Sequence, residues 1–250
     1  MIGLSHRPLP DDPGLAALSE TDRIAVAGAW RGRARNELTT SSVFASLTRA
    51  LIAFRAPREV VRQAANAVPD EVRHAEICMH VARAYWPDCP DAEPSQVVEA
   101  PFEIRLDVST VLYVVMQSCI NEGAAAAYLQ RALDEAEHPL ARAALRDILT
   151  DEVHHARFGW TFLAGQAIDP EWRRPIAEAV PTLLQRVTDA WMEQLASGDV
   201  PRGHGAISAD HGKDVLRDAY DALILPGFDA VGIDSAPGRK WLARRWAPAA

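Results

Sequence analysis

Two Glu-x-x-His motifs are the residues of this chain best suited to chemistry. Each motif is preceded, about one helix length upstream, by a single Glu in a stretch of mostly apolar or small residues. In chain order the six residues are Glu37, Glu71, His74, Glu122, Glu152 and His155. A Glu and a His three positions apart lie on one face of a helix. Four carboxylates and two imidazoles suit a pair of divalent metal ions that share ligands.

Four helices are needed to bring these side chains together. The sequence predicts them over residues 19–54, 57–86, 107–137 and 140–167. Ser19 followed by Asp22 is typical of a helix start, and Gly32 is a point where the first helix could break. Pro69 lies inside the second helix just before its motif, where a proline can kink the chain. His138 and Pro139 form a tight break between the last two helices.

With this order of residues, the chain resembles the ferritin-like di-iron carboxylate superfamily over residues 20–168. The resemblance implies an all-α fold, a ferritin-like four-helix bundle, with residues 87–106 as a long crossover between helices 2 and 3. It also implies that Glu37, Glu71 and His74 bind one iron. The other iron would be bound by Glu122, Glu152 and His155, with Glu71 and Glu152 as the bridging candidates.

The resemblance extends to the Asp residue that precedes each motif Glu. In this superfamily such an Asp often accepts a hydrogen bond from the ligand His of the partner helix, which fixes the ring. We therefore expect Asp70 to pair with His155 and Asp151 with His74. The second motif has His154 where the first has Arg73, a departure from the common form, and we interpret His154 as a residue that binds no metal.

Several residues near the predicted ligands could line a pocket for a small organic substrate. Small residues at 123–127 leave room beside Glu122, although alanines are equally explained by close helix packing. In relatives, the position of Cys78 holds the radical Tyr of the ribonucleotide reductase small subunit or a Cys of methane monooxygenase hydroxylases. Cys78 is equally explained as a small core residue. The pocket candidates are Thr40, Phe44, Cys78, Cys119 and Ala126.

Outside the bundle we expect an irregular N-terminal arm over residues 1–18 and a C-terminal helical extension over 169–250. The extension is expected to contain helices over 170–195, 213–225 and 239–246, and a Gly-rich loop over 197–212. It could cap the bundle, form a dimer face or cover a substrate entrance. Its last helix is basic and aromatic, which fits either packing on the bundle or docking of an acidic electron donor such as a ferredoxin or reductase.

Composition narrows the class of protein. The formal net charge of −8 argues against a nucleic-acid partner. The most apolar stretch, residues 111–129, is interrupted by Gln117, Asn121 and Glu122, so we expect no membrane association. Three cysteines without Cys-x-x-Cys spacing indicate neither a disulfide framework nor a rubredoxin-type site. We see no signal peptide and expect a cytoplasmic protein, with a homodimer left open.

The resemblance implies a di-iron oxidoreductase that activates dioxygen to hydroxylate or N-oxygenate a small molecule, of monooxygenase or oxidase type. The aminobenzoate N-oxygenases carry an additional His ligand where this chain has Ile148, so that match is incomplete. The alternatives are a ferroxidase or iron-handling protein, and a di-manganese catalase or peroxidase. Two iron ions are the expected cofactor, although the same ligands also accept a mixed manganese–iron or a manganese pair.

Overall fold

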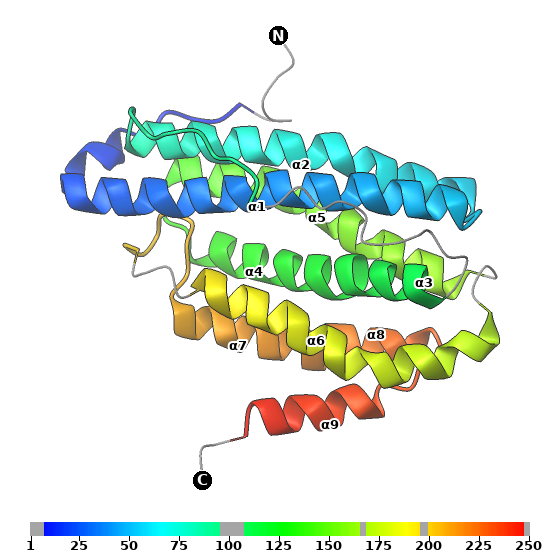
Figure 1. Ribbon diagram of the computed structural model, residues 1–250. Coiled ribbons are helices and arrows are strands. Elements are labelled where there is room, and N and C mark those ends of the chain that lie inside the picture. The colour runs from blue at the N-terminus through cyan, green and yellow to red at the C-terminus, as the bar shows by residue number, and fades with distance from the viewer. Residues whose placement is uncertain (1–7, 96–107, 166–168, 196–199, 248–250) are drawn as a thin grey trace.

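The computed structural model describes residues 8–95, 108–165, 169–195 and 200–247, and all regular secondary structure in these ranges is helical (Figure 1). None of the helices in these ranges is long and apolar enough to cross a lipid bilayer. The longer helices are α1 (Glu20–Ala53), α2 (Arg58–Tyr85), α4 (Glu122–Glu135), α5 (Pro139–Ala164) and α6 (Arg173–Leu195). The shorter ones are α3 (Val108–Val114), α7 (Ala209–Ala219), α8 (Leu225–Ala230) and α9 (Ala236–Arg245).

The first two helices form a long hairpin. The Ser19 side chain accepts a hydrogen bond from the Asp22 backbone N–H, so α1 begins as the sequence predicts. The helix then continues through Gly32, and the break considered there does not occur. Similarly, α2 is one helix from Arg58 to Tyr85 with Pro69 inside it.

The third helix changes its winding immediately before Glu122. Between α3 and α4 the chain forms a π-helical segment, Val115–Asn121, so the three pieces make one rod. At its end the Glu122 backbone N–H bonds to the carbonyl of Gln117, five residues back. A helix wound in this way carries an extra residue in one turn, a feature often found at functional sites.

The α1–α2 hairpin packs against a second hairpin made by the α3–α4 rod and α5. Residues 86–95 run back along α1, where Arg31 donates to the carbonyls of Pro90 and Asp91, and Thr39 contacts Ser95. This stretch begins the crossover expected over 87–106. The rest of that crossover, from residue 96 on, lies outside the described residues.

The C-terminal helices form a further layer on the α3–α4 side (Figure 1). Here α6 packs along the α3–α4 rod, α7 packs on α4, and α9 packs on α6. One apolar core joins Phe44 and Phe158 of the hairpins to Leu184 and Phe228 of this layer. Residues 169–247 as described therefore share the core of the bundle.

The structure differs from the prediction at several boundaries. One is the end of the helix predicted over 213–225, which continues through a π-helical segment, Tyr220–Ile224, into α8. The residues expected in the irregular arm include a 3-10 helix, Pro13–Ala17, which buries Leu15. Helix α7 begins at Ala209 inside the predicted loop, because Ser208 accepts from the His211 N–H and caps it. Helix α9 begins at Ala236 because Pro237 suits its first turn.

The basic C-terminal helix is packed on the rest of the protein. Trp241 is buried and donates to the Gln185 side chain of α6 at 3.0 Å. Arg239 forms ion pairs with Asp229 and Asp221. Of the two interpretations of this helix, these contacts support the packing one.

A close contact between α5 and the π-helical segment depends on Gly159. The Ser118 hydroxyl donates to the carbonyl of His155 and accepts from the N–H of Gly159. A Cβ at position 159 would lie 2.7 Å from Ser118 Oγ and 2.8 Å from Cys119 Sγ. We therefore expect Gly159→Ala to destabilise the protein by about 1–3 kcal/mol, as overpacking does.

Urea denaturation would measure this effect. The matched control is Gly28→Ala, because a Cβ at position 28 of α1 would meet nothing within 4 Å. Alanine favours a helix over glycine by about 1 kcal/mol, so the control should be unchanged or slightly more stable. Equal stability of the two variants would refute the close contact at Gly159.

Candidate metal centre

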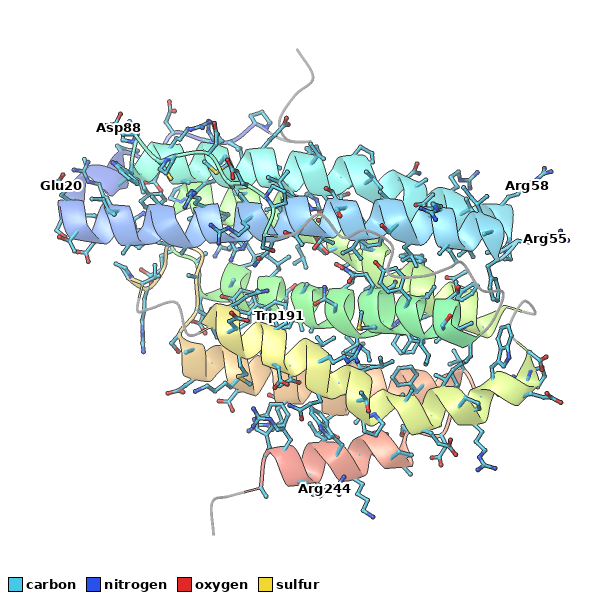
Figure 2. The ribbon with its side chains drawn as sticks, in the orientation of Figure 1. Glu20, Arg55, Arg58, Asp88, Trp191 and Arg244 are labelled. Atoms are coloured by element: carbon cyan, nitrogen blue, oxygen red, sulfur yellow. The ribbon has the colours of Figure 1, made fainter. Side chains whose placement is uncertain are left out.

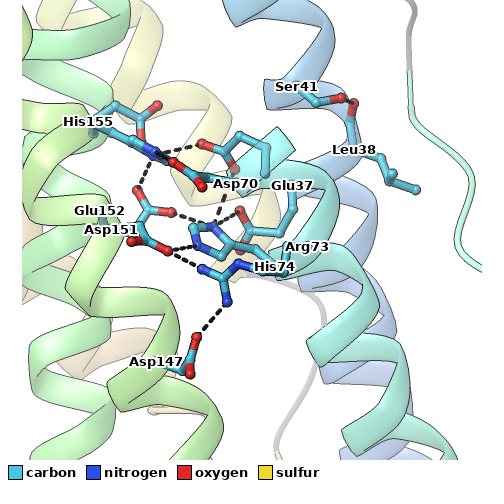
Figure 3. A network of polar contacts seen from close by, with 12 residues as sticks. Glu37, Leu38, Ser41, Asp70, Arg73, His74, Asp147, Asp151, Glu152 and His155 are labelled. Carbon is cyan, nitrogen blue, oxygen red and sulfur yellow. Dashed lines mark hydrogen bonds and ion pairs between the residues drawn. The ribbon is translucent and has the colours of Figure 1, made fainter. Parts of the chain in front are cut away.

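The six residues singled out by the motifs meet in the middle of the four long helical rods. Figure 3 labels four of them, Glu37, His74, Glu152 and His155. All six are buried, and Glu71 and His74 have no exposed surface. They are Glu37 of α1, Glu71 and His74 of α2, Glu122 of α4, and Glu152 and His155 of α5.

These side chains form two overlapping groups, each of which could hold a metal ion. The first group is Glu37, Glu71, His74 and Glu152; the second is Glu71, Glu122, Glu152 and His155. Within each group, one ligand atom from every member lies within 4.8 Å of the others. Glu71 and Glu152 belong to both groups, which is the arrangement expected of carboxylates that bridge two ions.

The histidine rings turn the same nitrogen toward the carboxylates. His74 Nδ1 lies 3.2 Å from a Glu152 oxygen and 3.7 Å from a Glu71 oxygen. His155 Nδ1 lies 3.0 Å from Glu71 and 3.6 Å from Glu152. Ligand bonds of about 2.0–2.2 Å to one ion place adjacent ligand atoms about 3 Å apart, so the spacing fits coordination.

The atoms that face the centre are buried without hydrogen bonds. Among the described residues, both carboxylate oxygens of Glu71, one of Glu152, and Nδ1 of His74 and His155 have no hydrogen-bond partner. Leaving such groups unpaired inside a protein is costly. Oxygen and imidazole donors that point at one another fit a bound divalent cation, which would satisfy them all.

The outward nitrogens of the two rings are held by aspartates of the opposite helix. His74 Nε2 lies 3.1 Å from Asp151 Oδ2, and His155 Nε2 lies 3.4 Å from Asp70 Oδ2. Both contacts are the cross-pairing that the resemblance to the di-iron superfamily implies. An Asp behind each ring leaves Nδ1 for the metal and fixes the ring orientation.

The two halves of the centre differ at one position of the motif. Arg73 reaches from α2 to α5 and binds both Asp151 and Asp147, the latter at 2.5 Å (Figure 3). The equivalent residue of the second motif, His154, is exposed and belongs to neither of the two groups. The guanidinium of Arg73 therefore holds the carboxylate of Asp151, whereas Asp70 has no equivalent arginine at position 154.

Glu122 is held by two amides that sequence reasoning noted only as interruptions of an apolar stretch. Gln117 donates to Glu122 Oε1 at 2.5 Å, and Asn121 donates to the same oxygen at 3.3 Å. Gln117 reaches Glu122 because the π-helical winding pairs positions five apart. An unbroken α-helix would place Ser118 there instead.

A cavity of about 600 Å³ opens onto the centre from the side of α1 and α4. It touches the ligand candidates Glu37, Glu122 and Glu152, and its outer wall is formed by Trp191, Gln194 and Leu195 of α6. Trp191 lies where α6 meets α4 (Figure 2), with its ring 5.2 Å from that of Tyr128. The C-terminal extension thus covers a route to the centre, one of the three roles considered for it.

Only one of the five predicted pocket residues, Thr40, lines this cavity. Phe44 instead packs its ring against His155 and Phe158. Cys78 and Cys119 are fully buried in the core. Cys78 does not line the cavity, because no residue of α2 contributes to the lining. Ala125 lines it instead of the predicted Ala126.

Burial and mutual charge control the protonation of the cluster. Burial raises the pKa of Glu37 and Glu122 well above the usual range, and neighbouring carboxylates raise it further. Burial alone would lower the pKa of His74 and His155, but the hydrogen bond of each ring to an Asp carboxylate and the nearby Glu carboxylates raise it well above the ordinary value. The pKa of Glu152 is lowered by its contacts with both histidines, against the effect of burial. The cluster therefore holds protons at neutral pH when no metal is bound.

Metal binding must displace these protons, so we expect metal affinity to fall as the pH is lowered. The raised pKa values of both His and of two Glu residues predict release of more than one proton per loaded chain. Calorimetric titration with Co²⁺ in buffers of different ionisation enthalpy counts the protons. A titration without proton release would contradict the protonated cluster.

Two further histidines lie outside this cluster. His204 is buried, bonds to the Tyr85 hydroxyl at 2.9 Å and stacks on His138. His211 lies at the start of α7 and contacts Glu135. Neither belongs to a metal-binding group among the described residues.

Comparison of the chain with protein-family models, with curated proteins and with solved structures found no match.

Proposed function

We propose that this chain is a non-haem di-iron oxygenase of the ferritin-like di-iron carboxylate superfamily, acting on a small molecule. The observation that carries the proposal is the pair of overlapping Glu/His groups, whose buried ligand atoms lack hydrogen bonds and face each other. Four glutamates carry four negative charges, which two divalent ions balance. Bound iron would supply the activation of dioxygen, and the protein supplies geometry and a shaped cavity.

The proposal assigns a role in metal binding to each residue of the centre. Glu37 and His74 would help to hold one ion and Glu122 and His155 the other, and Glu71 and Glu152 would contribute to both. Asp70 and Asp151 hold the rings in the orientation that points Nδ1 inward.

The cavity favours an oxygenase over an iron-handling protein or a catalase. A volume of about 600 Å³ lies within the range of about 300–1,000 Å³ that is usual for small-molecule sites. Dioxygen, peroxide and ferrous ions need much less room. The aromatic and apolar side chains of Tyr128, Leu129, Trp191 and Leu195 suit an organic substrate.

Anaerobic loading with ferrous iron, followed by rapid mixing with dioxygen, tests the proposal. We expect consumption of dioxygen and a transient visible absorption, which Glu71→Ala abolishes. Disproportionation of hydrogen peroxide by a manganese-loaded protein would support the catalase alternative. Iron that is oxidised and accumulates beyond the two sites would support iron handling, and either result would count against the oxygenase.

A further inference from the structure

With two divalent ions bound at the centre, the cavity beside it would carry an excess of positive charge. Its charged lining residues are Arg33, Arg35 and three of the ligand glutamates. Two divalent ions would balance the four glutamates of the cluster, so the metal-loaded site is formally neutral. The two arginines then remain as the uncompensated charges of the described cavity wall.

Arg33 is held in a fixed position. Its Nη2 donates to the carbonyl of Gly205 at 2.9 Å, and its guanidinium lies 4.5 Å from the centre of the Trp30 ring. Trp30 is almost fully buried and donates to the carbonyl of His204. Gly205 is at φ +91°, and a Cβ there would lie 2.5 Å from the Trp30 ring. Only glycine suits this approach of the loop to the ring.

The guanidinium of Arg33 keeps most of its donors for another partner. Among the described residues, no ion pair joins Arg33 to a carboxylate, and its one side-chain hydrogen bond is to a carbonyl. Arg73, in contrast, is satisfied by Asp147 and Asp151. A guanidinium has five N–H donors in a planar fork that matches a carboxylate.

The distance from Arg33 to the centre suits a small substrate. Arg33 precedes Glu37 by one turn on the same face of α1, a rise of about 6 Å. Tyr128 and Trp191 form an aromatic wall on the other side. Arg35 lies at the exposed side of the cavity, where its charge would attract an anion.

We propose that the substrate is a carboxylate with a small apolar or aromatic body, and that Arg33 binds its carboxylate group. The body then lies along Tyr128 and Trp191, with its far end at the metal cluster. This inference rests on the proposed function, because it assumes that metal ions neutralise the glutamates.

Calorimetric titration of the ferrous protein under nitrogen tests this, with iron content measured on the same samples. The probes are phenylacetate, phenylpropionate and hexanoate, each compared with its own amide. We expect at least one acid to bind tenfold or more tightly than its amide. Arg33→Gln should remove that preference and leave amide binding unchanged. A carboxylate held only by the metal would bind equally well to the Arg33→Gln variant.

Arg31→Gln is the matched control, since Arg31 is on the same helix but binds the carbonyls of Pro90 and Asp91 away from the cavity. It should keep the preference for the acid. The proposal is overturned if no acid binds better than its amide, or if Arg33→Gln keeps the preference. If Arg33→Gln does not fold, Arg33→Lys takes its place. Lysine keeps the charge but lacks the planar fork, so we expect the preference for the acid to fall, and an unchanged preference would overturn the proposal.

The iron measurement separates the two proposals. Protein that takes up no iron contradicts the di-iron proposal. The proposal that Arg33 binds a substrate carboxylate is then contradicted as well, because it assumes bound metal. Full iron content without any preference for a carboxylate contradicts the role of Arg33 alone.

Discussion

Replacement of Glu71 by alanine is expected to abolish binding of both metal ions. Glu71 belongs to both Glu/His groups, and both of its oxygens face the centre without hydrogen bonds among the described residues. Glu37 belongs to the first group only, so Glu37→Ala should lose one ion and keep the other. Metal content after anaerobic reconstitution, together with circular dichroism, measures both effects.

The helices should survive the Glu71 change. A buried carboxylate without hydrogen bonds destabilises the metal-free protein, so its removal costs little beyond a small cavity. Glu76→Ala is the matched control, because Glu76 is exposed on the same helix and should leave the metal content unchanged. Two ions retained by Glu71→Ala would refute its assignment as a bridging ligand.

Asp151→Asn is expected to weaken metal binding in the His74 half by about 10–100-fold, the usual scale for a residue that orients a ligand. The Asp151 carboxylate holds His74 Nε2 at 3.1 Å and also binds Arg73. An asparagine removes the charge that both partners face, and it leaves Arg73 with Asp147 alone.

Asp70→Asn provides the comparison from the other half of the centre. Its contact with His155 is longer, at 3.4 Å, and its side chain is 33% exposed. We therefore expect a smaller loss than at Asp151. Competition titrations with a chelator measure both affinities, and an unchanged affinity for Asp151→Asn would remove Asp151 from this role.

The candidate ligands follow from the sequence because they depend on local helical spacing. Glu and His three positions apart must share a face. Two such motifs on separate helices can meet only if both faces turn inward. The cross-contacts of Asp70 and Asp151 were implied by the resemblance to the di-iron superfamily, and the structure contains both.

The surroundings of Glu122 did not follow from the sequence, because they depend on a change in winding. The π-helical segment turns Gln117 toward Glu122 and leaves Cys119 in the core. In a regular α-helix, Cys119 would share a face with Glu122, three positions further on, and could line a pocket beside it. The π-helical winding changes this register, so the prediction of Cys119 as a pocket residue was wrong. The pair of amides within an apolar stretch was the available signal, since buried amides need partners.

The residues that line the cavity also could not be predicted from the sequence. Trp191 and Gln194 reach it from a helix that is distant in the chain, and no periodic pattern links them to the motifs. Arg33 is on the same helix as Glu37, but its importance depends on the absence of a carboxylate partner among the described residues, which only the structure shows.

The central claim is that the six clustered residues bind two divalent metal ions. The most direct test is the iron content of the chain by mass spectrometry after anaerobic reconstitution with ferrous iron and removal of excess metal. The account predicts about two iron ions per chain, with Glu71→Ala losing both. A chain that keeps its fold and retains no metal after this treatment would contradict it.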